Sequence, residues 1–497
     1  ASNTANVGSL NCSSTGDIRM FAIDFDNSKL WAGKNGTWYN TSGTSYTNST
    51  GPESGNNYIV NGWNYDVAKL FTGHNDSSCG VNFNFGQDGT FAGNKTAQGN
   101  SDATGYGNFY YTVPDGFLAV CSGNQPVAAA VDPAQTDDDF PQKLFQALAY
   151  TGDGNTTRSL TLNFKPDWTW LKQRSHNYQH TLYDTTRTYA TLKALSSDGN
   201  WAEGGGGDNS GNGYLSSSDS SGFSLNRGTN TSAGTSLTNS SSTTYASWNW
   251  RANGGTTSTN TSGSVNSTVQ ADPSGAFSIV TWAGSGGAAT IGHGLSGAPS
   301  FMAAKSRTSG ATVMDFIIFH KNMNNGAYPA NESRMYWNST GGYSTGALWQ
   351  NDNNSASVFG VTSNISNSSK NYVAYCFTDV EGYCKAHYYK GNGSGTDGPF
   401  IYTGFRPAFI LVKRVDSSGA WYIQDNTRDP FNPAYHVLKP NNSNAEEAYT
   451  DGTDYNDFLS NGFKVARGGD AANFNTSGAT YIYLAMAKNP FKYATAR

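Results

Sequence analysis

The last three-quarters of the chain repeat one pattern three times, and this repetition constrains the fold more than any other feature. Each copy begins with a glycine turn, at residues 152–154, 284–286 and 391–393. A proline follows, then a lysine six residues later and an arginine just beyond it: Pro166, Lys172 and Arg174; Pro299, Lys305 and Arg307; Pro407, Lys413 and Arg414. Each copy closes on an apolar run, at residues 245–250, 372–377 and 481–486. A period of roughly 110–130 residues is the size of a small domain, so we expect tandem modules.

Most of the chain consists of short runs in which apolar and polar residues alternate, separated by clusters of Gly, Asn, Ser and Asp. Val, Ile, Phe, Tyr, Trp and Thr dominate these runs, as they do in the strands of half-buried sheets. Helical periodicity is almost absent, apart from one short helix expected near residues 141–149. The pattern predicts an all-β fold built from tandem antiparallel β-sandwich modules of jelly-roll or lectin-like type.

The domain boundaries follow the repeats. We expect an N-terminal β-sandwich at residues 1–125 and three repeats at 140–253, 271–383 and 384–497. A Pro/Ala stretch that runs into an acidic patch predicts a linker at 126–139, and a stretch with hardly an apolar residue predicts a second linker at 254–270. The junction between the second and third repeats is short, so we expect those two repeats to pack more rigidly than the first and second.

Composition narrows the classes of function. Charged residues make up 13% of the chain, and the net charge is −5, which gives no electrostatic reason to expect nucleic acid as a partner. No apolar run approaches the roughly 20 residues of a membrane span, so membrane insertion is not expected. We find no cofactor motif and no catalytic constellation, and we expect neither a cofactor nor an enzyme. The five cysteines are odd in number and widely spaced, which favours free thiols; Cys12–Cys121 and Cys376–Cys384 bridges are the alternatives.

Two repeats share an acid–arginine pair, Asp184 with Arg187 and Asp425 with Arg428, where the second repeat has His320. One interpretation is a polar patch for a ligand; the other is an ion pair that fixes a turn after an apolar strand. A position that recurs between modules favours the second interpretation. The repeated lysines are interpreted in the same way, as framework residues that end edge strands and oppose aggregation.

Candidate binding residues are few. Five aromatic residues beside Asn or Asp could stack on sugar rings, although most Trp residues of a β-module lie in its core: Trp201, Tyr214, Trp337, Trp349 and Trp421. A cluster of oxygen ligands is a candidate Ca²⁺ site without the closing glutamate of an EF-hand: Asp451, Asp454 and Asp457.

The closing runs of the repeats carry a family resemblance. Residues 481–494, 373–383 and 402–409 resemble the C-terminal β-modules of marine bacteriophage virion proteins of tail-fibre type. Residues 16–38, 81–87 and 114–117 resemble the second half of a SPRY-type β-sandwich, a fold that binds proteins through its loops. The first half of that fold is not found in the sequence.

The resemblance implies a structural protein of the phage virion, located outside the host cell. It implies other virion proteins as partners, a homo-oligomer, and adhesion to a host surface glycan or protein through several weak contacts. The alternatives are a capsid-surface or assembly-only protein, or an extracellular filament glycoprotein, with no host ligand. A polysaccharide-cleaving enzyme would need two carboxylates about 5–9.5 Å apart in a groove, and no pair in the sequence stands out.

Overall fold

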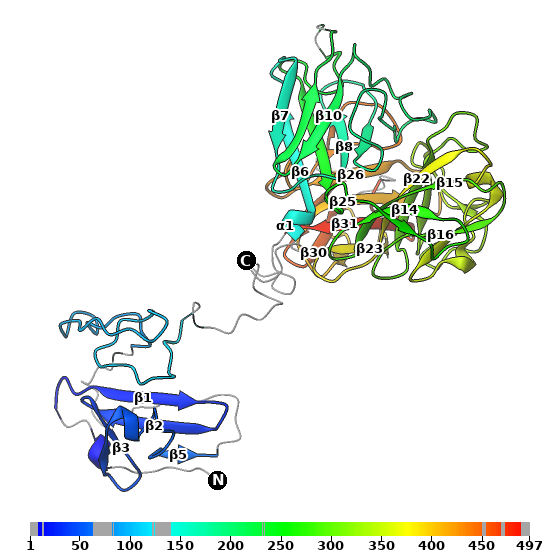
Figure 1. Cartoon of the computed structure of the whole chain (residues 1–497). Helices are drawn as coiled ribbons and strands as arrows, with labels where there is room; N and C mark the ends of the chain where they lie inside the picture. Colours follow the sequence, from blue (N-terminus) through cyan, green and yellow to red (C-terminus); the bar gives the residue numbers. More distant parts are fainter. Residues whose placement is uncertain are drawn as a thin grey trace. The chain divides into compact units, whose positions relative to one another are not determined.

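The computed structural model describes residues 8–11, 14–62, 82, 84–121, 124, 141–230, 232, 234–449, 454–468 and 473–488. The chain divides into two compact units, Ala1–Val127 and Ala128–Arg497 (Figure 1). The linker predicted at 126–139 lies outside the described residues. The described part is almost entirely antiparallel β-sheet, as the sequence predicts. None of its helices is both long enough and apolar enough to cross a membrane.

The N-terminal unit contains one five-stranded sheet in the order β1-β2-β3-β4, with β5 paired to β2. Its small core consists of Ala22, Trp31 and Trp38, against which Phe117 packs. The strands are β1 (Arg19–Asp24), β2 (Lys29–Lys34), β3 (Thr37–Tyr39), β4 (Ser45–Tyr46) and β5 (Val60–Asn61), and the 3₁₀ turns are Gly8–Leu10 and Asn48–Thr50.

The first repeat is a two-layer sandwich. Its inner sheet has the order β6-β12-β8-β9 and its outer sheet the order β10-β11-β7. A short helix, α1 (Pro141–Leu144), precedes β6, so only the start of the predicted helix is helical. The strands are β6 (Phe145–Thr151), β7 (Thr157–Thr161), β8 (Trp168–Gln173), β9 (Thr181–Asp184), β10 (Tyr214–Asp219), β11 (Gly222–Asn226) and β12 (Thr244–Trp250).

The second repeat has a six-stranded inner sheet, β13-β14-β15-β22-β17-β18, and the small sheets β16-β21 and β19-β20. The linker predicted at 254–270 is wrong, because β13 and most of β14 lie within these residues. The two strands have few apolar side chains, but their backbone groups are satisfied by pairing with neighbouring strands. The strands are β13 (Ser258–Asn260), β14 (Ser267–Ala271), β15 (Phe277–Ala283), β16 (Ala289–Gly292), β17 (Phe301–Ser306), β18 (Ile317–His320), β19 (Ser333–Arg334), β20 (Ser344–Thr345), β21 (Val358–Val361) and β22 (Asn371–Phe377), and the 3₁₀ turns are Asn351–Asn353 and Ser363–Ile365.

The third repeat follows the plan of the first. Its inner sheet has the order β23-β31-β25-β26, its outer sheet the order β24-β30-β29, and β27 pairs with β28. The strands are β23 (Cys384–Lys390), β24 (Phe400–Tyr402), β25 (Pro407–Arg414), β26 (Trp421–Asp425), β27 (His436–Val437), β28 (Glu447–Ala448), β29 (Asp454–Leu459), β30 (Gly462–Gly468) and β31 (Thr480–Ala487).

One apolar core joins the three repeats. It contains buried residues from all three inner sheets. The Trp168 ring of the first repeat stacks on Tyr375 of the second, with ring centroids 4.2 Å apart, and Phe145 of the first lies 5.6 Å from Phe409 of the third. The repeats therefore form one compact unit. The first repeat packs against the second and the third, so the structure does not set the second and third apart from the first as a more rigid pair.

The glycine turns recur because backbone from another part of each repeat passes directly over them. A β-carbon on Gly152, Gly284 or Gly391 would lie only 2.0–2.2 Å from a carbonyl oxygen, that of Ser240, Asn367 or Thr476 respectively. The glycine two residues later has a positive φ of 77°, 84° and 69° in the three turns. Only glycine fits both positions without strain, which explains the repeated Gly-x-Gly pattern.

We expect Gly391→Ala to lower the free energy of unfolding by about 1–3 kcal/mol, because the new methyl group overlaps the Thr476 carbonyl. Gly287→Ala is the matched control, since nothing lies within 4 Å of its would-be β-carbon. Chemical denaturation of both variants measures the difference. Equal stability of the two variants would show that the close approach at Gly391 does not restrict this position.

Candidate functional site: polar contacts between the repeats

The acid–arginine pairs end the last strands of two inner sheets. After β9, the Arg187 backbone N–H donates to Asp184 Oδ1 (2.9 Å) and its Nε to Oδ2 (2.6 Å). After β26, Arg428 makes the same two bonds to Asp425, at 2.9 and 2.5 Å. These contacts confirm the interpretation of a turn-fixing ion pair. Both pairs are sealed from solvent, with side-chain exposures of 0–1%.

Each of these positions also contacts the next repeat. The Tyr375 hydroxyl of the second repeat donates to Asp184 of the first (2.8 Å), and Trp248 Nε1 of the first donates to Asp425 of the third (2.9 Å). His320 occupies the same register position in the second repeat, and its Nε2 donates to the Tyr483 carbonyl of the third (3.1 Å). The first repeat thus contacts the second, the second the third and the third the first, which closes a ring.

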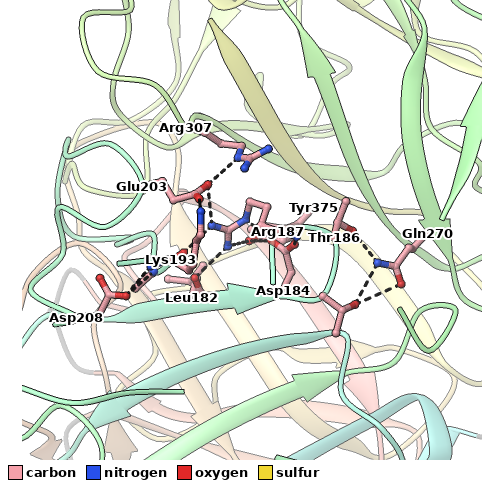
Figure 2. Close-up of polar contacts among 12 residues, drawn as sticks. Leu182, Asp184, Thr186, Arg187, Lys193, Glu203, Asp208, Gln270, Arg307 and Tyr375 are labelled. Carbon is pink, nitrogen blue, oxygen red and sulfur yellow. Dashed lines mark hydrogen bonds and ion pairs between the residues drawn. The ribbon is translucent and has the colours of Figure 1, made fainter. Parts of the chain in front are cut away.

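Glutamates extend two of these three contacts. Glu203 accepts from Arg187 (3.4 Å) and Lys193 (2.9 Å) of its own repeat and from Arg307 (2.7 Å) of the second repeat (Figure 2). Two further residues of the interface, Thr186 and Gln270, are joined by a bond of 2.7 Å from the Gln270 amide.

Glu446 of the third repeat has the same role at the next interface. It accepts from Arg428 (2.9 Å) and from Arg174 of the first repeat (2.6 Å). Glu203 follows Asp184 by 19 residues whereas Glu446 follows Asp425 by 21, so the sequence does not align the two glutamates and they were not predicted.

The contact between the second and third repeats keeps the geometry but loses the charge. The Glu203 backbone N–H donates to the Arg307 carbonyl (3.1 Å), and the corresponding bond here runs from Tyr343 to Val415 (2.8 Å). Val415 therefore stands where the other repeats have an interface arginine. Arg414 pairs with Tyr481 in the third repeat, just as Gln173 pairs with Tyr245 in the first. Arg414 therefore corresponds to Gln173, and its predicted match with Arg174 is wrong by one residue.

His320 and Met323 replace the acid and the arginine at this third interface. Both are fully buried. Burial lowers the pKa of His320 to about 3, so the ring is neutral and its Nδ1 accepts from the Asn322 backbone N–H (3.0 Å). An uncharged set of side chains thus makes the same kind of contact as the two ion-pair networks.

The surrounding charges lower the pKa of three acids of the network, Asp425, Glu203 and Glu446. Burial alone would raise the pKa of Asp425, but Arg428 brings it below its ordinary value. The pKa values of Glu203 and Glu446 are lowered in the same way, by arginines acting against burial. Burial raises the pKa of Tyr375 well above its ordinary value, so its hydroxyl keeps its proton. Charged acids paired with arginines therefore bind the repeats together.

The three repeated lysines are buried, which corrects their interpretation as edge-strand residues. Each lies on a strand with neighbours on both sides, and its Nζ donates to a carbonyl of another repeat: Lys305 to Gly199 (2.8 Å), Lys413 to Thr340 (3.2 Å) and Lys172 to Ser443 (3.2 Å). Burial lowers the pKa of Lys172 and Lys305 to about 8 and that of Lys413 to about 7. The lysines are thus a second ring of contacts between repeats.

Three of the five predicted glycan contacts are wrong. Trp337, Trp349 and Trp421 are 0–1% exposed, and the Trp421 indole donates to the Tyr336 carbonyl (2.9 Å) across an interface between repeats. Trp201 is 41% exposed and Tyr214 is half-buried. These two remain candidates.

The predicted Ca²⁺ site is not assembled in the described residues. Asp451 lies outside them, and Asp454 and Asp457 are three positions apart on β29. No group of three His, Cys, Asp or Glu residues in the described ranges could hold a metal ion. The thiols of Cys376 and Cys384 are free and buried, as expected.

Comparison with known proteins places the repeated unit in a family. Residues 140–490 match a family described as a domain of unknown function, DUF7483. No curated protein and no solved structure matches the chain. The matched segment contains the three repeats and their ring of contacts and amounts to well over half of the sequence. The chain belongs to the DUF7483 family.

Proposed function

We propose that the protein is a structural component of a bacteriophage particle, of tail-fibre or adhesion type, which contacts a host surface glycan or protein. The observation that carries the proposal is the ring of contacts between repeats. It makes one compact body from three sandwiches, each of which places an outer layer on the side away from the shared core. A rigid body of this kind favours the presentation of binding surfaces at fixed positions over an active site that must change conformation.

The burial of the polar network supports a role without catalysis. The two acid–arginine pairs at its centre have almost no exposure and are satisfied by partners within the protein. Several weak contacts made by modules at fixed spacing raise avidity by about 10²–10⁴ without a strong single site. The family resemblance of the closing runs supplies the phage setting, with other virion proteins and further copies of the chain as partners.

Electron microscopy of purified particles, with an antibody against the repeated unit, tests this function. We expect label on a tail appendage or projecting fibre. Label spread over the capsid would favour the capsid-surface alternative and remove adhesion. Absence of the protein from all particles would refute the proposal.

A further inference from the structure

The third repeat differs from the other two on the outward face of its outer sheet. The edge strand of each outer sheet has a buried aliphatic residue that pairs with a phenylalanine of the neighbouring strand. These pairs are Leu160 with Phe223 in the first repeat, Ile291 with Phe359 in the second and Ile401 with Phe463 in the third. The residues on either side of this buried position are Phe400 and Tyr402 in the third repeat. They are Ser159 and Thr161 in the first repeat and Thr290 and Gly292 in the second.

Both aromatic rings are open to solvent. Phe400 is 47% and Tyr402 65% exposed, whereas Ile401 between them is buried. Residues two apart on a strand share a face, so the two rings stand together on the outer side of the sheet. The fold does not need them there, since Ser159 fills the position of Phe400 in the first repeat and simply bonds to Ser224 Oγ (2.8 Å).

The neighbouring strand, β30, provides a glycine beneath the rings and a charged residue beside them. A β-carbon on Gly462, which pairs with Tyr402, would lie 3.0 Å from the Phe400 ring, so this ring leans over the glycine. Lys464 pairs with Phe400, and its Nζ contacts the exposed Asp397 carboxylate (2.6 Å). Hydrogen-bond donors and acceptors therefore border the two rings.

The size of this surface argues against a protein partner. The exposed parts of two aromatic side chains provide on the order of 200 Å², far below the roughly 800 Å² per partner of a stable protein interface. The free edge of β24 is also poor for pairing with another strand. The strand is three residues long and follows Pro399, which has no backbone N–H.

We infer that Phe400 and Tyr402 form a carbohydrate-binding platform in the third repeat, with Lys464 and Asp397 bonding to the sugar hydroxyls. A sugar ring has an apolar C–H face that stacks on an aromatic ring and hydroxyls that bond to charged groups at its edge. The inference rests on the glycan contact within the proposed function and names its site. The first and second repeats lack the two rings and do not bind sugar at this position.

Affinity electrophoresis of the full chain tests the platform. Native gels are cast with laminarin, dextran, alginate or bacterial lipopolysaccharide. The platform variant F400S/Y402T installs the serine and threonine of the first repeat, and the control variant S159A/T161S alters the same positions of that repeat. We expect at least one polysaccharide to retard the wild type and the control, and the platform variant to lose at least about fivefold in apparent affinity. Equal melting temperatures confirm that both variants are folded.

Three results would overturn the inference. Unchanged retardation of F400S/Y402T would place glycan binding elsewhere on the protein. No retardation of the wild type in any gel would remove the platform, while label on tail fibres in the particle images would still support the virion function. Self-association in sedimentation that disappears in F400S/Y402T would identify a second copy of the chain as the occupant. Conversely, glycan binding at Phe400 and Tyr402 by a protein that is absent from particles would refute the virion function alone.

Discussion

Replacing Arg187 with methionine should lower the free energy of unfolding by about 3–5 kcal/mol, the usual loss when one partner of a buried ion pair is removed. The Asp184 carboxylate has no exposure and would keep only the Tyr375 hydroxyl and its own turn as partners. Arg187 also donates to the Leu182 and Lys193 carbonyls, at 3.2 and 2.7 Å, which would lose this donor. Urea denaturation followed by tryptophan fluorescence measures the change.

The second repeat provides the control and a rescue. Met323→Leu changes the corresponding position at the uncharged interface, and we expect it to cost less than about 1.5 kcal/mol. The double variant D184H/R187M copies His320 and Met323 into the first repeat and should be more stable than Arg187→Met alone, because the buried charge is gone. A loss below about 1 kcal/mol for Arg187→Met, the value for an exposed ion pair, would contradict a sealed interface.

The wild type should gain stability over a Lys413→Met variant as the pH rises from 7 to 10. Burial lowers the pKa of Lys413 to about 7 in the folded state, from an ordinary 10.5. Between these values the unfolded chain holds a proton that the folded chain has released. Stability rises with pH wherever the unfolded state binds more protons, so the difference should grow by up to about 1.4 kcal/mol per pH unit.

The comparison between two proteins isolates this lysine. Buried tyrosines such as Tyr375, whose pKa burial raises, destabilise the fold above pH 10, but both proteins contain them. Denaturation curves of the wild type and Lys413→Met at pH 7, 8, 9 and 10 give the difference directly. Parallel stability profiles would mean that the Lys413 ammonium is held charged by the Thr340 and Arg414 carbonyls, which accept its hydrogen bonds at 3.2 and 2.6 Å.

The sequence predicts the features that repeat within a module. The alternating runs predict strands. The Gly-x-Gly turns recur because local backbone geometry requires them in each copy, and the acid–arginine pairs recur in the first and third repeats, where they fix the same turn. The glycines at 152, 284 and 391 meet a carbonyl in the same way each time. Features of this kind depend on neighbours in the same repeat, so internal comparison is enough to find them.

Contacts between repeats could not be predicted in the same way. The central strands β8, β17 and β25 are buried on both faces, so alternation gives no sign of which residues face solvent. Trp421 and Lys413 are covered by another repeat, which the sequence of their own repeat does not reveal. Tyr375 is not repeated, and Glu203 recurs as Glu446 only at a different sequence spacing, so their roles depend on how one sandwich meets the next. Comparison of the repeats does not find the aromatic pair on β24, because Phe400 and Tyr402 differ from their counterparts.

Hydrogen exchange of the full chain tests the central claim, that the ring of contacts makes the three repeats one cooperative body. We expect the central strands β12, β22 and β31 to exchange through a common opening with the same free energy, and Arg187→Met to lower that free energy equally in all three. The decisive segment is β31, which makes none of the Arg187 contacts. If β31 kept its full protection in the variant while β12 and β22 lost theirs, the repeats would be independent domains and the account would be wrong.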